Sequence, residues 1–448
     1  MSETIDKASD EVSLKLRLNE ESVSSVDEGA TRKELDRIYR KLDLRIIPAL
    51  WCLYFLTSFG GSAYGVSLTM NRAEGHSLGQ KLNLTAKQTS TASALDFVGL
   101  ILFDVPMNLI MTRVSPQSWL ARIVVSVGLV YACYIALESA GALIAVRFIS
   151  GVVGAGTWPG MSYYVSLWYP NDRLTRRIGY YFTAAQISAA AAGLLSAAFQ
   201  KMDGVKGYTG WQWLYLHPLS SLEREVHRKD IENRYSMVKW TWKDVSAILF
   251  DLRLWAIIMM YFGVVGTGFG LAVFGSVIIA TSNPGLSSIS VSLLYAPIWL
   301  FDLAGILLIT PFADRYKKHR AVFFSGACLI IITGMFVNTF AKGSWNRYGG
   351  LLIAGFGLGP TVPICMSWAA EIFGPEYGDS GIAMSAALVS GLGNLGSVTA
   401  TYALYSGWPS DAERLYRDSN MVLVGLLGVS IISSGACHML RNRVKRVF

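Results

Sequence analysis

Apolar runs of about 20 residues alternate with short polar segments along most of the chain. A helix of about 20 apolar residues is long enough to cross the hydrocarbon core of a bilayer. Eleven such runs are present, and each predicts one membrane-spanning helix. The predicted spans are residues 46–69, 90–111, 117–137, 140–168, 178–199, 254–280, 289–312, 321–340, 348–372, 381–405 and 421–440. The pattern therefore predicts an all-α polytopic membrane protein.

The polar segments divide the chain into regions. Residues 1–45 are polar and of mixed charge, without the basic start and apolar core of a signal peptide, and predict a disordered cytoplasmic arm. The other predicted regions are an N-terminal transmembrane half at 46–216, a charged cytoplasmic linker at 217–250, a C-terminal transmembrane half at 251–440 and a basic cytoplasmic tail at 441–448. The N-terminal half then has five spans and the C-terminal half has six.

An N-terminal half of five spans conflicts with the charges of the loops. Cytoplasmic loops of membrane proteins carry an excess of Lys and Arg. With the amino terminus inside, five crossings would leave the linker, the basic loop at 314–320 and the basic tail outside. One further span between Leu216 and His217 would return all three to the cytoplasm. The sequence thus predicts that a sixth helix is missing at this junction. The alternative is a short or re-entrant crossing by the segment WQWLYL.

Composition narrows the classes of function. Hydrophobic residues make up 52% of the chain and charged residues 16%, and the basic excess behind the net charge of +8 lies in loops and the tail. This distribution is typical of membrane topology and does not indicate a nucleic-acid partner. The five cysteines lie in apolar runs without metal or redox spacing, and no phosphate-binding glycine loop or nucleophile motif is visible. We expect neither enzyme chemistry nor a bound metal or cofactor.

The span at 140–168 carries one charge, Arg147, inside its apolar run. A charge at such a depth costs at least about 2.5–3.5 kcal/mol on insertion scales, so it should face a cavity or a partner. Glycines around it allow a neighbouring helix to approach closely, and Pro159 is expected to kink the span. Because a guanidinium binds a carboxylate through two parallel hydrogen bonds, Arg147 is the leading candidate for binding an anionic substrate. The alternative is a structural tie between Arg147 and a buried carboxylate or backbone carbonyls.

Three carboxyl groups in the predicted spans are candidates for proton coupling. A proton carrier needs a carboxyl group whose pKa rises when the group is buried and unpaired. Asp302 lies near the middle of its span and is the preferred candidate. Asp104 lies nearer the inner end and fits a gate or a helix cap, and Asp96 lies nearer the outer mouth. Pairing with a neighbouring arginine or a helix end is an open alternative for all three.

Further candidates for substrate contact are one amide and three aromatic side chains. Asn394 either hydrogen-bonds the substrate or joins two helices. Tyr54, Tyr261 and Trp368 either stack on a planar substrate or serve only in packing.

The segment GILLITPFADRYKKHRAV, at 305–322, forms a charged turn between two spans and contains Asp314, Arg315 and Arg320. Charged side chains in such a turn form ion pairs and helix caps in one conformation and release them in another, as a gate requires. Arg176 and Arg177, in the basic loop after the fourth span, complete the predicted gating group. The alternative is a solvated loop.

Several motifs resemble the major facilitator superfamily and, within it, the fungal allantoate permease group of anion:cation symporters. The motifs are Lys41-Leu42-Asp43, Pro106-Met107-Asn108, Arg147-Phe148, Pro159-Gly160, Ser166-Leu167-Trp168-Tyr169, Arg176-Arg177, Gly210-Trp211-Gln212-Trp213, Ser367-Trp368 and Gly393-Asn394. The resemblance implies two six-helix halves that rock around a central site. It also implies a monomer of the fungal plasma membrane that imports a small carboxylate, similar to allantoate, nicotinate or pantothenate, together with protons.

The chain departs from this group at three places. The group usually has Leu-Asp-Arg-Ser-Asn near the end of the first span, whereas the uncharged Phe59-Gly60-Gly61-Ser62-Ala63 stands here. The group favours Glu-Ala-Gly in the fourth span, whereas Gly154 precedes Ala155-Gly156 here, so the carboxylate that the group usually has near Arg147 is absent. The group also has a hydrophobic sixth helix between Gly-Trp-x-Trp and Glu-Arg. Here Glu223-Arg224 follows without that helix, which again indicates a missing span.

Two rival functions remain open at this point. The same fold would serve to export a small metabolite. Alternatively, the chain is a truncated, non-transporting form or a membrane sensor, because a bundle that lacks one helix has an unsealed cavity wall. Proton-dependent accumulation in cells distinguishes import from export, and carboxylate binding without flux would indicate the non-transporting form.

Overall fold

The computed structural model describes residues 36–111, 113–169, 173–215, 242–405, 407–411 and 413–447. The chain divides into two compact units, Met1–Leu50 and Trp51–Phe448, and the described part of the first is the helical segment 36–50. All regular structure in the described residues is helical. Eleven of the described helices are long and apolar enough to cross a membrane. The prediction of an all-α polytopic fold with eleven visible spans is confirmed.

Each predicted span corresponds to one helix. The eleven are Asp36–Ser67, Lys87–Met111, Pro116–Ala136, Ala140–Trp168, Arg176–Met202, Leu252–Ser282, Ser288–Arg315, Lys317–Phe340, Ser344–Gly378, Gly381–Leu404 and Arg417–Arg441. The largest difference from the prediction is at the first helix, which begins at Asp36 rather than at residue 46 and so takes in ten residues of the predicted arm. These added turns contain good helix formers such as Arg37, Arg40 and Lys41.

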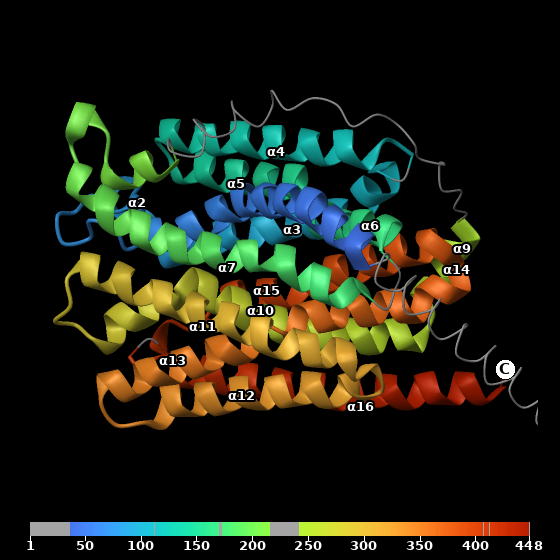
Figure 1. Cartoon of the computed structure of the whole chain (residues 1–448). Coiled ribbons are helices and arrows are strands. Elements are labelled where there is room, and N and C mark those ends of the chain that lie inside the picture. The colour runs from blue at the N-terminus through green and yellow to red at the C-terminus, as the bar shows by residue number, and fades with distance from the viewer. Residues whose placement is uncertain are drawn as a thin grey trace, which may run out of the picture. The chain divides into compact units, whose positions relative to one another are not determined.

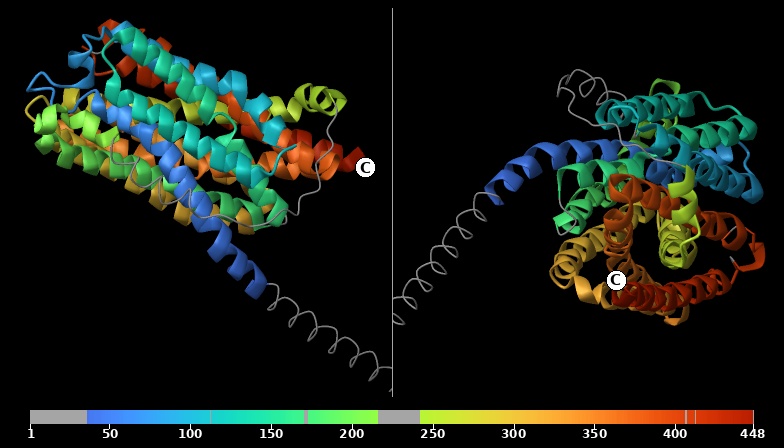
Figure 2. Two further views of the ribbon diagram at one scale, coloured as in Figure 1. Left: turned by 90° about the horizontal axis from the view of Figure 1, so that it is seen from above. Right: turned by 90° about the vertical axis from the view of Figure 1, so that its right-hand side faces the viewer.

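The helices after the first fall into two groups along the chain, one on each side of residues 216–241. The first contains α3 (Ala86–Met111), α4 (Pro116–Cys133), α5 (Ala140–Gly154), α6 (Thr157–Trp168) and α7 (Leu174–Phe199). The second contains α10 (Leu252–Ser282), α11 (Ser288–Arg315), α12 (Arg320–Phe340), α13 (Ser344–Leu358), α14 (Thr361–Gly393), α15 (Leu395–Val398) and α16 (Arg417–Val447). Figure 1 shows the first group, cyan to green, above the second, yellow to red, with α7 packed against α11 at the boundary. The end-on view on the right of Figure 2 separates the same two groups.

The fourth span is broken near its middle. α5 ends at Gly154 and α6 begins at Thr157. Gly156, between them, has a φ of 81°, a left-handed conformation that favours glycine, and a Cβ there would lie 3.1 Å from the Cβ of Met107. The kink expected from Pro159 is thus present, but Gly156 makes it. Pro159 lies in the first turn of α6, where its missing N–H costs little.

The close packing of α3 and α5 depends on Gly151. A Cβ at this position would lie 1.9 Å from the backbone oxygen of Asp96 on α3. We expect Gly151→Ala to push the helices apart and to lower the free energy of unfolding by about 1–3 kcal/mol. Gly141→Ala, also on α5, is the matched control, because a Cβ there meets nothing within 4 Å. Thermal unfolding of the two purified variants measures the difference, and equal stabilities would contradict this packing.

A similar glycine contact shapes the second group. A Cβ on Gly396, in α15, would lie 2.0 Å from the backbone oxygen of Phe262 on α10. The chain just before this contact holds Asn394, and just after it the helix widens to a π-helix at Thr399–Leu404. π-Helical turns occur frequently at functional sites.

Some predictions fall on residues outside the described part of the chain. These are the junction of Leu216 and His217, where the missing helix is expected, residues 217–241 of the linker region, and residues 1–35 of the arm. The linker region resumes with helix α9, Trp242–Leu249.

Candidate functional site

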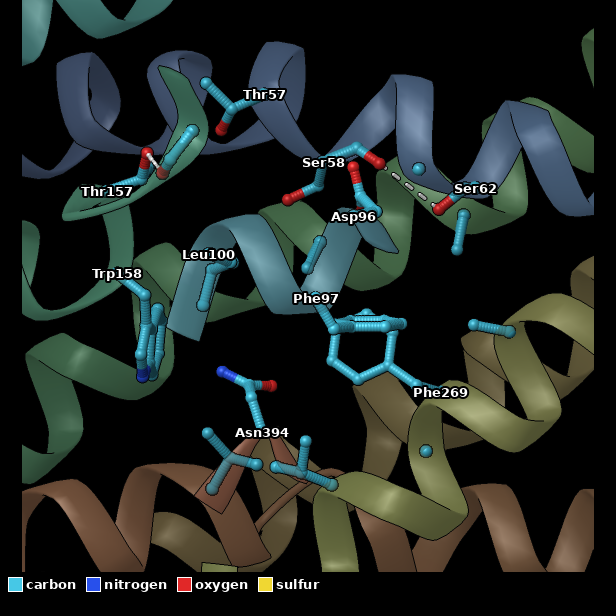
Figure 3. Close-up of a pocket in the computed structure, with 18 of the residues that line it drawn as sticks. Thr57, Ser58, Ser62, Asp96, Phe97, Leu100, Thr157, Trp158, Phe269 and Asn394 are labelled. Atoms are coloured by element: carbon cyan, nitrogen blue, oxygen red, sulfur yellow. Dashed lines mark hydrogen bonds between the residues drawn. The ribbon is translucent and has the colours of Figure 1, made fainter. Parts of the chain in front are cut away.

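A cavity of about 270 Å³ lies between the two groups of helices. The first helix, α3, α4, α5, α6 and α7 line it on one side, and α10, α11, α13 and α14 line it on the other together with Asn394. Figure 3 shows the side chains that project into it, including Asp96 and Leu100 from α3 and Trp158 from α6. Residues from both groups of helices therefore line one cavity.

Arg147 lines this cavity from α5 and is only 2% exposed. Its Nη2 lies 3.4 Å from Oδ2 of Asp96, and its Nε donates to the backbone oxygen of Ala92 at 3.4 Å. The guanidinium also lies over the ring of Tyr64, at 4.2 Å from the ring centroid. These contacts compensate part of the charge that the apolar span carries.

These contacts match the alternative of a tie between Arg147 and a buried carboxylate or a backbone carbonyl. The carboxylate is Asp96 from α3, whereas the resembling group supplies a glutamate from the fourth span. The sequence held a signal for this pair, because Asp96 and Arg147 lie at similar depths from the same ends of two helices that run in the same direction. Their distance is longer than the roughly 2.7–2.9 Å of a strong charge-assisted hydrogen bond. A better-placed substrate carboxylate would therefore compete with Asp96 for Arg147.

The other two carboxyl groups line the cavity in different environments. Asp104 accepts a hydrogen bond through Oδ1 from the backbone N–H of Gly156, at 2.7 Å, and so holds the break between α5 and α6. Asp302 is 1% exposed, and its Oδ1 has no hydrogen-bond partner among the described residues. It lies near the middle of α11. Of the three candidates, Asp302 is the one for which the described residues provide neither a cation nor a backbone donor.

The predicted aromatic and amide candidates are only partly brought together. Tyr54, Tyr261 and Asn394 line the cavity, and Asn394 donates to the backbone oxygen of Ser390 at 2.8 Å. Trp368 is fully buried within α14 and is not among the lining residues. No cluster of three His, Cys, Asp or Glu side chains suited to a metal occurs in the described part of the chain.

Two aromatic lining residues, Trp158 and Phe182, were not among the candidates. Their ring centroids lie 4.9 Å apart, and the ring of Tyr54 lies 5.3 Å from Trp158 and 6.0 Å from Phe182. The signal for Trp158 is its position two residues after Gly156, because the broken backbone turns the start of α6 toward the cavity. Phe182 carries no comparable signal.

The predicted gating residues gather at the end of the bundle where α7 begins and α11 ends. Oδ2 of Asp314 accepts a hydrogen bond from the backbone N–H of Arg176 at 2.6 Å, which joins the two groups of helices. Nη2 of Arg320 lies 3.7 Å from Asp314 and 3.0 Å from Glu371, a partner that the prediction did not include. Arg315 is exposed.

Arg177 makes contacts of a different kind. It donates from Nη1 to the backbone oxygen of Arg173 at 2.9 Å and lies over the ring of Tyr169. These contacts join residues within the first group of helices, on either side of the loop after α6.

Contacts also join the two groups on the other side of the cavity. Nε2 of Gln200 donates to Oγ of Ser292 at 3.1 Å, and Oγ of Ser276 donates to the backbone oxygen of Gly65 at 3.3 Å. The cavity thus lies between two sets of contacts that join helices of the N-terminal part of the chain to helices of the C-terminal part.

A bundle of membrane-spanning helices in two groups around such a cavity defines a membrane transport protein. A family model described as Major Facilitator Superfamily matches residues 50–401. The chain belongs to this superfamily, and it is a multi-pass secondary transporter.

Two named relatives of the chain are also transporters. The chain is 44% identical to Vitamin H transporter 1 of Schizosaccharomyces pombe, a match that covers 90% of this chain and 80% of the relative. It is 27% identical to a putative tartrate transporter of Agrobacterium vitis, with 88% and 93% of the two chains covered. The crystal structure of the fucose:proton symporter of E. coli superposes with a TM-score of 0.63 at 13% identity, over 87% of this chain and 98% of that one. This last likeness concerns the fold alone.

The alignment with Vitamin H transporter 1 has more positions than the number of residues that this chain contributes to it. It extends over 455 positions, whereas 90% of the 448 residues here is about 403. The difference means that about 50 aligned positions of the relative have no counterpart in this chain.

Proposed function

We propose that this transporter imports a small organic anion, a carboxylate, together with protons. The observation that carries the proposal is Arg147, a buried guanidinium in the wall of a cavity that lies between two groups of helices. A cation in a site of low dielectric constant pairs strongly with a carboxylate. Vitamin H and tartrate, the compounds named for two relatives, both carry carboxyl groups. This supports assignment to the anion:cation symporter group. The further proposed substrate contacts are Asn394, Tyr54 and Tyr261, which line the cavity. Trp368 does not line the cavity and would contact the substrate only after a movement of the helices.

Proton coupling follows from the charges around the cavity. When a substrate carboxylate takes Arg147, Asp96 loses its cation, and a buried carboxylate without a cation is costly. Uptake of a proton removes that cost. Asp96 is therefore one candidate carrier. The preferred carrier is Asp302, because it lies near the middle of its span and its Oδ1 has no hydrogen-bond partner among the described residues, and Asp104 is the other alternative. Anion binding and proton binding then favour each other.

Gating rests on the contact between α7 and α11. Release of the Arg176 N–H from Asp314 separates the two groups at that end, and Arg320 keeps Asp314 oriented from within the second group. Arg315 and Arg177 belong to the same basic region, which the charge rule assigns to the cytoplasm.

The full transport unit has twelve helices in this proposal, with the sixth absent from this chain between Leu216 and His217. The loop charges require it, and the roughly 50 positions that the chain lacks relative to Vitamin H transporter 1 provide length enough for one span of about 20 residues. The domain limits at 46–216, 217–250 and 251–440 follow from this layout. We assign the protein to the fungal plasma membrane as a monomer, in keeping with the resemblance.

The direction of transport is tested in cells that express the chain. We expect labelled biotin, which is vitamin H, to accumulate in these cells several-fold above cells with the empty vector, and accumulation to increase as the external pH is lowered from neutral. Release of the label from preloaded cells measures transport in the outward direction. Outward movement without uptake would contradict import and favour the exporter.

A further inference from the structure

The cavity has two chemically different ends. Arg147 and Asp96 form the charged end. Tyr54, Trp158 and Phe182 form the aromatic end, where the three ring centroids lie between 4.9 and 6.0 Å from one another. All five residues line the same cavity. Figure 3 shows Trp158 at the left and Asp96 above the centre of the view, with Leu100 of α3 between them.

The distance between these ends follows from the helical rise. On the continuous helix α3, Asp96 and Asp104 are eight residues apart, which corresponds to roughly 12 Å at 1.5 Å per residue, and Asp104 is bonded to Gly156, two residues before Trp158. On the first helix, Tyr54 and Ser62 line the cavity eight residues apart, which again corresponds to roughly 12 Å. Both estimates place the two ends of the cavity roughly 12 Å apart along the helices.

The aromatic end is built to hold its shape. Trp158 follows the left-handed Gly156, whose N–H is fixed by Asp104, so the indole is positioned by a rigid break rather than by a regular helix. The ring of Tyr181 packs edge-on against Trp158 at 5.5 Å, and its hydroxyl is hydrogen-bonded to Ser162 at 2.8 Å. Aromatic rings that are fixed in this way lose little entropy when a flat group packs against them.

We propose that the substrate is an elongated carboxylate with a ring or another flat apolar group at its far end. Arg147 takes the carboxylate, and Trp158 and Phe182 decide specificity by packing against the ring. This inference rests on the proposed function, because it assumes that a carboxylate binds at Arg147. A compact dicarboxylate such as tartrate is too short to occupy both ends and fills only the charged one.

A series of ω-phenylalkanoates, from benzoate to chains of seven or eight methylene groups, tests the length of the site. Dissociation constants are measured by calorimetry or thermal shift with the purified full chain in detergent. We expect affinity to pass through a maximum at an intermediate length, about tenfold or more tighter than for benzoate and for tartrate, or about 1.4 kcal/mol. Equal affinity at every length would overturn the inference and leave carboxylate recognition intact. Failure of every carboxylate to bind would instead overturn the proposed function.

Variants locate the aromatic end. Phe182→Leu and Trp158→Leu should each make the affinity for the phenylalkanoates depend less on their chain length. The affinity of both variants for tartrate should stay within about twofold of that of the parent protein. Trp158→Phe should keep the dependence on chain length. Trp168→Leu is the matched control, because Trp168 ends the same helix, is 37% exposed and does not line the cavity. If Trp158→Leu does not fold, Phe182→Leu alone tests the aromatic end, because Phe182 is half-buried and its replacement disturbs the packing less. A retained maximum in a folded Phe182→Leu variant would contradict the assignment.

Discussion

Replacing Arg147 by alanine is expected to reduce carboxylate uptake at least about 25-fold. Truncating one partner of a buried charge pair typically costs about 2–5 kcal/mol, and each 1.4 kcal/mol is a factor of ten in affinity. Arg147 is 2% exposed, so little water is available to replace its donors. Uptake of labelled biotin, compared at equal amounts of protein in the membrane, measures the loss.

The alanine variant also leaves Asp96 without its cation, which by itself disturbs the fold. The double variant Arg147→Ala with Asp96→Asn separates the two effects, because it removes both charges together. We expect the double variant to regain thermal stability and to remain inactive. Arg147→Lys should transport poorly as well, because an ammonium lacks the planar fork of the guanidinium. Retained uptake with unchanged affinity in any of these variants would refute the role of Arg147.

Replacing Asp302 by asparagine is expected to abolish accumulation driven by a proton gradient while leaving exchange of labelled for unlabelled substrate. The amide resembles the protonated acid, so the loaded carrier still reorients, but it cannot release a proton inside. Asp302 is buried and its Oδ1 lacks a partner among the described residues, so the substitution breaks no contact made by that atom. Measured in liposomes, exchange should stay within about threefold of the parent protein and accumulation should fall to the equilibrium level.

Asp104→Asn provides the matched control for this result. Its remaining oxygen still accepts the N–H of Gly156, so the break between α5 and α6 is preserved. We expect this variant to accumulate substrate in response to the gradient. If Asp104→Asn or Asp96→Asn loses accumulation while Asp302→Asn keeps it, the proton is carried elsewhere than proposed.

The spans could be predicted from the sequence because the length of an apolar run reports directly on membrane crossing. Only the first helix differed substantially, since residues 36–45 are polar yet consist largely of good helix formers. The kink of the fourth span was predicted from Pro159, although Gly156 makes it, because a positive φ is a tertiary outcome that the sequence only permits.

The site was less accessible to sequence reasoning. A single charged residue in an apolar span is easily recognised in a sequence as a candidate site residue, and Arg147 does line the cavity. Its partner Asp96 comes from a different helix, and only the packing of α3 on α5 at Gly151 shows that they meet. Tryptophans give even less information. Trp368 is enclosed in α14 and Trp158 faces the cavity, and no local pattern separates them before the helices are placed.

The most direct test of the central claim uses the 448-residue chain itself in liposomes. Labelled biotin is offered outside, with the external pH one unit below the internal pH. Proton-coupled import of a carboxylate predicts accumulation above the concentration outside, abolished by a protonophore and by Arg147→Ala. Binding of the carboxylate without any flux would contradict the account and would leave the chain as a binding protein that requires its sixth helix to transport.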